Sequence, residues 1–282
     1  MKVTLNEVMA YAEKHNCAIA AFNTPNFENM RAAIDAAEEL NVPIIIAHAQ
    51  VHEPDAPLRF VAPVMVKMAE LARVPVCVHL DHGTDLNYME EALKCGFTSA
   101  MYDGSLLPLE ENIKNTKIAR ELTNKYGANL EAEIGVIGGR LPENLADAKP
   151  EDLYTKPEDA KRFVAETKID ALACGFGTSH GIYKAAPKLS FSTVENVRSA
   201  IGGLPIVMHG GSGISADGYR SAIKAGVRKI NYYTYMSKAG LAAAKAFCEE
   251  HPEEVYYHSM ATAAYKAMKE DFIKAMKIFY NL

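Results

Sequence analysis

The sequence predicts an α/β fold, a (β/α)8 TIM barrel with additional C-terminal helices. Two observations carry this prediction. Short apolar runs alternate with helix-periodic stretches eight times over roughly 230 residues, which suits a closed barrel better than a doubly wound sheet. Reactive side chains also collect at the ends of these runs, where barrels of this class place their active sites. No Pro-rich or Ser-rich linker interrupts the pattern, so residues 1–282 are expected to form a single domain.

The predicted strands are short and rich in Val, Ile, Ala or aromatic residues, as expected for strands buried on both faces. They are Ile19–Asn23, Val42–Ala49, Val74–Asp81, Phe97–Asp103, Asn129–Gly135, Asp170–Gly177, Leu204–Gly210 and Arg228–Thr234. In three of these runs a proline stands second, near a strand start, where its missing N–H costs least.

Amphipathic stretches between the runs predict the surrounding helices. The first four are Asn26–Leu40, Leu58–Leu71, Leu86–Cys95 and Leu109–Tyr126. A further helical stretch, Glu253–Tyr280, lies beyond the eighth unit. We expect it to pack on the barrel wall or on another subunit.

The composition is that of a globular enzyme, with 49% apolar and 23% charged residues. A net charge of −5 and a pI near 6.0 argue against partners such as nucleic acid or an anionic membrane. The five cysteines are scattered and form no Cys-x-x-Cys pair, which is typical of reduced thiols. Neither a signal peptide nor a membrane-spanning window is recognisable, so we expect a cytoplasmic protein.

Three histidines stand at the ends of the third, sixth and seventh predicted strands: His82, His180 and His209. A closed barrel brings strand ends around one mouth, and three neutral imidazoles with an open fourth position form a catalytic zinc site. A single histidine in a barrel is more often a hydrogen-bonded packing residue. Three at strand ends, each beside Gly or Asp, favour a shared metal ion.

Asp81 precedes His82 at the end of the third strand. Adjacent strand residues point to opposite faces, but a chain that turns at the strand end can bring both side chains to the mouth. The carboxylate suits a general acid/base and, equally, a residue that orients an imidazole. Asn23 and Ser105, also at strand ends, are candidates for substrate contacts.

A Gly-rich turn, Gly210-Gly211-Ser212-Gly213, follows the seventh strand and precedes a helix expected to begin near Ser215. Glycine lets backbone N–H groups approach an anion, and a helix N-terminus favours negative charge. An ordinary strand-to-helix turn is the alternative. Phosphate sites in such barrels follow strands seven and eight, and Asn231 and Thr234 after the eighth strand are expected to complete the cradle.

Five ordered motifs resemble the class II, zinc-dependent fructose-bisphosphate and tagatose-bisphosphate aldolases. The motifs are His79-Leu80-Asp81-His82, Glu131-Ala132-Glu133-Ile134-Gly135, Gly177-Thr178-Ser179-His180-Gly181-Ile182-Tyr183, His209-Gly210-Gly211-Ser212-Gly213 and Lys229-Ile230-Asn231. The resemblance runs from Leu5 to Ser237 and so covers nearly the whole predicted barrel.

The resemblance implies an enzyme that reversibly cleaves a ketose phosphate into dihydroxyacetone phosphate and an aldehyde. Such an enzyme acts in carbohydrate metabolism, for example in glycolysis. It implies one catalytic Zn²⁺ per chain, bound by His82, His180 and His209, with Asp103 and Glu133 near an alternative, inner metal position. Asp81 would act as the acid/base on the C4 hydroxyl. The implied assembly is a homodimer or homotetramer.

The same resemblance implies a pocket for the phosphate of dihydroxyacetone phosphate, with a monovalent cation (Na⁺ or K⁺) beside it. Its implied residues are Gly181, Lys184, Gly210, Gly211, Ser212, Asn231 and Thr234.

The sequence departs from the family pattern in its loops. Family members usually carry acids after the Gly-Gly that follows the fifth strand, and one is assigned to proton transfer at C3. Here Arg140 and Leu141 follow, and Glu143 would take that role only if the loop folds over the site. Arg140 is either a contact for an anionic end of the substrate or a solvated loop charge. The segments Ala47–Gln50 and Tyr232–Met236 also differ from the family.

Fructose 1,6-bisphosphate and tagatose 1,6-bisphosphate are the expected substrates. A ketose 1-phosphate with a modified C6, for example 6-deoxy-6-sulfofructose 1-phosphate, is the alternative because the departures lie toward that end. A Schiff-base aldolase would need a lysine inside the barrel, and Lys229 is expected at the start of the eighth strand, at the wrong end. A non-catalytic sugar-phosphate-binding barrel is the third hypothesis, because the usual loop acids are missing.

Overall fold

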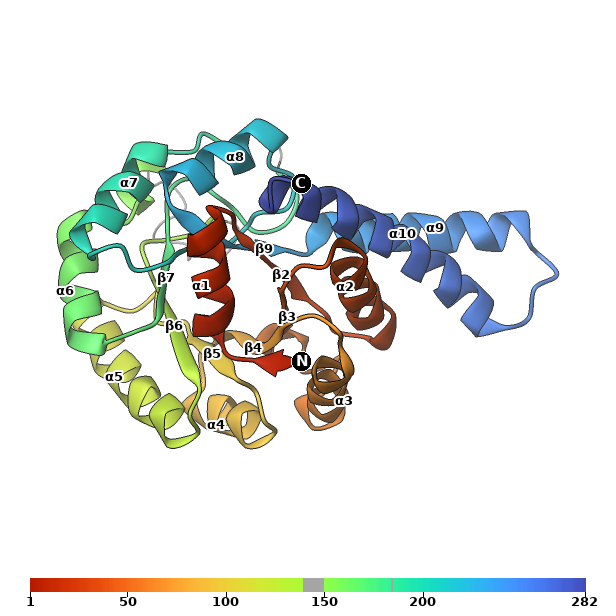
Figure 1. Cartoon of the computed structure of the whole chain (residues 1–282), viewed down its shortest axis with the longest axis horizontal. Helices are drawn as coiled ribbons and strands as arrows, with labels where there is room; N and C mark the ends of the chain where they lie inside the picture. The colour runs from red at the N-terminus through yellow and green to blue at the C-terminus, as the bar shows by residue number, and fades with distance from the viewer. Residues whose placement is uncertain (139–149, 184) are drawn as a thin grey trace.

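The computed structural model describes residues 1–138, 150–183 and 185–282. Within these residues, eight parallel strands, β2 to β9, close into a barrel ringed by helices, which confirms the predicted fold class (Figure 1). The order around the barrel is β4-β3-β2-β9-β8-β7-β6-β5, and pairing of β5 with β4 closes it. A two-residue strand, β1, adds to β4 through the pair Lys2 and Val76.

The barrel strands occupy the predicted positions, mostly with narrower bounds. The strands are β1 (Lys2–Val3), β2 (Ile19–Asn23), β3 (Ile44–Ala49), β4 (Val76–Gly83), β5 (Ser99–Tyr102), β6 (Asn129–Ile134), β7 (Ala171–Cys174), β8 (Ile206–Met208) and β9 (Val227–Tyr232). Pro43, Pro75 and Pro205 each stand immediately before a strand. The carbonyl groups of Pro75 and Pro205 accept hydrogen bonds from the neighbouring strands, whereas no N–H is required of a proline there.

Helices follow the strands and cover the outside of the barrel. They are α1 (Leu5–His15), α2 (Phe27–Leu40), α3 (Leu58–Leu71), α4 (Leu86–Lys94), α5 (Leu109–Lys125), α6 (Pro157–Thr167), α7 (Phe191–Ala200), α8 (Ala216–Ala225), α9 (Thr234–Glu250) and α10 (Tyr257–Phe279), with short 3-10 turns η1 (Gln50–His52) and η3 (Pro150–Leu153). The eighth strand was expected to reach Thr234, but it ends at Tyr232 and Thr234 already begins α9.

Local sequence explains where α2 begins and ends. The Asn26 side chain accepts a hydrogen bond from the backbone N–H of Asn29, and the Asn29 side chain accepts one from the backbone of Asn26. Asn41, with a φ of 54°, ends the helix in the left-handed conformation. The helix buries small and apolar residues such as Ala33 and Ala37, which lets it lie close to the strands. The helix begins soon after Asn23, the last residue of β2.

The two C-terminal helices extend together away from the barrel, and α10 then returns to it (Figure 1). Along its length α10 packs on α9 and α2. Near its end, Phe272 lies against Phe22 with ring centroids 3.9 Å apart, and the buried Tyr280 hydroxyl accepts a hydrogen bond from the backbone N–H of Ala20. Helix α10 therefore packs on the barrel wall, one of the two positions expected for it. No described helix has the length and apolar character that crossing a membrane requires.

Candidate active site

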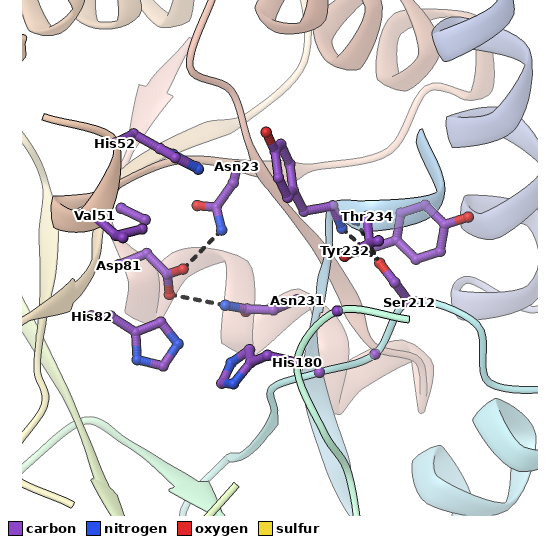
Figure 2. A pocket seen from close by; sticks show the side chains of 15 residues that line it. Asn23, Val51, His52, Asp81, His82, His180, Ser212, Asn231, Tyr232 and Thr234 are labelled. Atoms are coloured by element: carbon purple, nitrogen blue, oxygen red, sulfur yellow. Dashed lines mark hydrogen bonds between the residues drawn. The ribbon is translucent and has the colours of Figure 1, made fainter. Parts of the chain in front are cut away.

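A pocket of about 190 Å³ opens at the carboxyl ends of the barrel strands (Figure 2). Most of the predicted site residues line it: Asn23, Asp81, His82, His180, Gly181, Gly210, Gly211, Ser212, Asn231 and Thr234. Ala49, Val51, His52, Tyr232 and Tyr233 form the rest of the lining. The third predicted imidazole, that of His209, lies fully buried behind it. Arg140, Glu143 and Lys184 lie outside the described residues.

The three predicted metal ligands come together although they are far apart in the chain. The ring centroids of His82 and His209 lie 4.5 Å apart, those of His82 and His180 5.0 Å, and those of His180 and His209 6.1 Å. One nitrogen from each ring lies within 4.8 Å of the others. The structure thus brings these three side chains together at one place.

Hydrogen bonds to carboxylates fix two of these rings. Nδ1 of His82 lies 2.7 Å from Oδ2 of Asp103, and Nε2 of His209 lies 2.8 Å from Oε1 of Glu131. A carboxylate accepts hydrogen bonds, so each of these nitrogens carries the proton. The remaining nitrogens, Nε2 of His82 and Nδ1 of His209, face each other at 2.9 Å.

This short contact needs a positive charge between the two nitrogens, either a proton on His82 or a metal ion in its place. A divalent ion supplies that charge, and neutral imidazole nitrogens are the donors that zinc prefers. The buried residues around the site therefore fit a metal ion of this type, with carboxylates orienting its imidazole ligands.

A second group of possible metal ligands adjoins the first and consists of His82, Asp103 and Glu133. Oε2 of Glu133 is buried and has no hydrogen-bond partner among the described residues. Burial and the neighbouring Asp103 raise the pKa of Glu133 well above its usual value. Although burial opposes it, Asp81, Asp103 and Glu133 together raise the pKa of His82 to about 9. The acidic surroundings thus attract positive charge to this end of the pocket.

An unusual backbone turn directs both Asp81 and His82 to the mouth. His82 has a φ of +48°, and the pairing of β4 with β5 shifts register between Leu80 and Gly83. This left-handed conformation is uncommon for a residue other than glycine, and such strained positions cost about 1–3 kcal/mol. At Gly83 a Cβ atom would lie 2.9 Å from the carbonyl oxygen of Met101, so a glycine is required there.

Two amides hold the Asp81 carboxylate in place (Figure 2). The Nδ2 groups of Asn23 and Asn231 donate to its two oxygens, each at 2.9 Å. Burial alone would raise the pKa of this carboxyl group, but His82, His209 and Lys229 hold it well below its usual range. Asp81 is therefore an ionised, oriented carboxylate that faces the pocket.

The Gly-rich turn after β8 brings backbone into the other end of the pocket. A Cβ atom on Gly211 would lie 2.6 Å from the carbonyl oxygen of Asn231, so the turn fits closely against β9. The Ser212 hydroxyl accepts hydrogen bonds from the backbone N–H groups of Tyr233 and Thr234 at the start of α9, at 2.9 and 3.0 Å. Backbone and hydroxyl donors next to a helix N-terminus are suited to a phosphate group.

Tyr183 joins the two loops that form this end, a role that sequence reasoning missed. Its hydroxyl accepts a hydrogen bond from the backbone N–H of Ser179 at 2.8 Å and donates one to the carbonyl of Gly210 at 2.7 Å. The N–H of His180 donates to the carbonyl of Gly138 at 2.9 Å. The loop that carries His180 is thus tied to both neighbouring loops. Tyr183 stands in a quoted motif, but only the fold shows what its hydroxyl reaches.

Two further residues differ from their expected positions. Lys229 was expected at a strand start, at the wrong end of the barrel, but it is the third residue of β9 and its side chain is buried inside the barrel. Its long side chain places Nζ 2.7 Å from Oε2 of Glu131 rather than in the pocket lining. Ser105, a predicted substrate contact, lies outside this lining, and its hydroxyl donates to Asp103 at 2.6 Å.

Comparisons with known proteins agree with this geometry. Residues 3–281 match the family described as fructose-bisphosphate aldolase class-II. The structure is similar to that of the YdjI aldolase from Escherichia coli K12, with 34% identity and a TM-score of 0.87 over 99% of this chain and 97% of that one. A putative fructose-1,6-biphosphate aldolase from Coccidioides immitis is 27% identical with a TM-score of 0.86, over 98% and 95% of the two chains. The fold is also shared with a fructose-bisphosphate aldolase from Campylobacter jejuni, at 24% identity, a TM-score of 0.82, and coverage of 99% and 95%.

Proposed function

Because the chain belongs to the class II fructose-bisphosphate aldolase family and is an enzyme of the aldolase type, we propose that it is a zinc-dependent aldolase of ketose 1-phosphates. It would reversibly cleave such a sugar into dihydroxyacetone phosphate and an aldehyde. Fructose 1,6-bisphosphate and tagatose 1,6-bisphosphate are the first substrates to test. The observation that carries the proposal is the convergence of three imidazoles beside an oriented carboxylate.

In this proposal His82, His180 and His209 hold the zinc ion. When bound, zinc polarises substrate oxygens as a Lewis acid and stabilises the negative charge that develops as the C3–C4 bond breaks. Asp103 and Glu131 accept hydrogen bonds from two of the imidazoles and so keep their free nitrogens directed at one point.

Asp81 would move the proton at C4. In the cleavage direction its carboxylate takes the proton of the C4 hydroxyl, C4 becomes the aldehyde carbon, and the bonding electron pair remains with C3. Asn23 and Asn231 keep the carboxylate aimed at the pocket. A proton must then be added to C3 to give dihydroxyacetone phosphate. Its proposed donor belongs to the segment that contains Arg140 and Glu143, which is outside the described residues.

The cradle of Gly181, Gly210, Gly211, Ser212 and Thr234 would bind the phosphate on C1. A monovalent cation beside this phosphate is part of the proposal. From the cradle the substrate would extend past the imidazoles toward Val51 and His52, which lie on the opposite side of the pocket (Figure 2).

The environment of Lys229 argues against the Schiff-base alternative. Its ammonium group is fully buried and paired with Glu131, and no lysine is found among the described residues that line the pocket. Alongside the zinc mechanism we propose a cytoplasmic enzyme, active as a homodimer or homotetramer, in which residues 1–282 form one domain.

A product assay tests the proposal. Ketose phosphates that differ at C4 and C6, including a 6-deoxy-6-sulfo sugar, are supplied to the protein as purified, after chelator treatment, and after zinc is added back. We expect dihydroxyacetone phosphate to form, to cease with chelation and to return with zinc. Activity that survives chelation and is lost on borohydride trapping would show a lysine mechanism. Binding of dihydroxyacetone phosphate without exchange of its C3 proton would show a non-catalytic barrel.

A further inference from the structure

A row of buried polar side chains crosses the barrel interior beneath the three imidazoles. Nδ1 of His79 lies 2.9 Å from the Ser99 hydroxyl, and Nε2 of His79 lies 3.3 Å from Nζ of Lys229. Nζ of Lys229 donates to Oε2 of Glu131 at 2.7 Å, and Oε1 of Glu131 accepts from His209. All of these side chains are inaccessible to solvent.

Stability alone does not account for an ion pair in this position. Removing a carboxylate and an ammonium group from water costs several kcal/mol per ion, and well-packed apolar residues of similar volume often serve a fold as well or better. The Lys229–Glu131 pair sits among strands whose other interior residues are mostly small or apolar. The pair is therefore better explained by what its geometry does for its neighbours.

Both oxygens of the Glu131 carboxylate accept hydrogen bonds. Lys229 occupies Oε2, which leaves Oε1 for Nε2 of His209. An ammonium group has only donors, so it can bond to Glu131 only through an acceptor oxygen. The carboxylate has one acceptor oxygen for each partner and no proton to donate. Nε2 of His209 must therefore be the donor and carry the proton. Its Nδ1 is then unprotonated where it faces His82 at 2.9 Å.

We propose that Glu131 and Lys229 form a positioning pair that sets the tautomer of His209 and thereby presents its Nδ1 to the metal ion. The inference rests on the metal site of the proposed function and extends it to two residues outside the ligand set. Neither residue lines the pocket, so both would act through His209 rather than on the substrate.

Glu131→Gln is the informative single variant because it is nearly isosteric. A glutamine has one acceptor oxygen, and the Lys229 ammonium group takes it. The amide NH₂ then points at Nε2 of His209 and favours the tautomer with its proton on Nδ1, toward the metal position. We expect zinc affinity to fall by about 10- to 100-fold, the usual effect of removing a partner of a metal ligand.

Adding Lys229→Met to Glu131→Gln distinguishes tautomer control from a general structural defect. Without the ammonium group the amide can turn its oxygen back to His209, so the double variant should regain part of the lost zinc affinity. A purely structural role predicts the opposite, since the second change removes one more buried contact. Equal or weaker zinc binding by the double variant would overturn the proposal, as would wild-type affinity in Glu131→Gln.

Arg228→Met is the matched control. Arg228 precedes Lys229 in β9 and forms an ion pair with Glu13, away from the metal site. Its loss should lower thermal stability without changing zinc affinity, which is measured by competition with a chromophoric chelator. A comparable fall in zinc affinity in this control would show that any broken ion pair in β9 has the same effect, contrary to the proposal.

The ¹⁵N chemical shifts of the histidine rings, measured on metal-free protein, give a readout that does not need zinc. We expect His209 to be protonated on Nε2 in the wild type and on Nδ1 in Glu131→Gln. Wild-type His209 protonated on Nδ1 would refute the inference even if zinc binds. Failure of the wild type to bind zinc, with the tautomers as expected, would instead refute the proposed function and leave tautomer control by Glu131 established.

Discussion

The two ends of the pocket are built in different ways. At the imidazole end most polar groups are side chains on or directly after strands, with His180 in the loop after β7 as the exception. Several bond to one another: Asp103 to His82, Glu131 to His209, and Asn231 to Asp81. At the cradle end the polar groups are largely backbone, carried by the loops after β7 and β8 and by the start of α9. Tyr183 joins these two loops through its hydroxyl.

In the proposed function, this difference separates chemistry from substrate binding. Groups that must hold a metal ion or a proton need fixed directions, and strand ends in a closed barrel provide them. A phosphate needs several N–H donors and tolerates small displacements, so tied loops are sufficient. Damage at the imidazole end should therefore reduce turnover, whereas damage at the cradle end should mainly weaken substrate binding.

The largest effect is expected from His209→Ala at the imidazole end. With one ligand gone, the protein should lose its zinc and at least about 10³-fold of its activity, given that a metal ion contributes several kcal/mol to charge stabilisation. Circular dichroism should show that the fold largely survives. Metal analysis of the purified variant decides the point, because zinc at the wild-type ratio would contradict the ligand assignment.

Asp81→Asn should have a somewhat smaller effect. The variant keeps its zinc but loses the proton acceptor, so cleavage should slow by about 10²- to 10⁴-fold. Steady-state rates and zinc content are measured together. Asp85→Asn is the control, since Asp85 is exposed and only caps α4, a role that asparagine also fills. Unchanged turnover in Asp81→Asn would reassign Asp81 to orienting its neighbours.

The smallest effect is expected from Tyr183→Phe at the cradle end. The change removes one hydrogen bond within the loop after β7, from Ser179, and one to Gly210 in the loop after β8. Each contributes about 0.5–1.5 kcal/mol. We expect KM to rise by roughly 5- to 30-fold while kcat changes less and zinc content stays constant. Tyr126→Phe is the control, because the Tyr126 hydroxyl bonds to Glu90 on the outside of the barrel. A fall in kcat with KM unchanged would show that the two ends are not separable.

Sequence patterns predicted the features that depend on periodicity and on strand ends. The alternation of apolar runs and helices is sufficient for the barrel, and a closed barrel necessarily brings His82, His180 and His209 to one mouth. The pattern does not show how far a long side chain extends from its strand or which groups it contacts. Lys229 looks like a polar residue at a strand start, yet its four-carbon chain carries the charge into the interior. The link made by Tyr183 depends on the spacing of two loops, which no single sequence specifies.

The left-handed turn at His82 makes the proposed metal ligand, His82, and the proposed proton acceptor, Asp81, parts of one rigid unit. A change in that turn would displace both together, so we expect this end of β4 to tolerate little variation if the proposed reaction is to be kept. New aldehyde partners would instead be accommodated by exchange of the η1 segment that carries Val51 and His52. Divergence of such an enzyme toward other sugars would thus keep its reaction and change only the wall of the pocket that η1 forms.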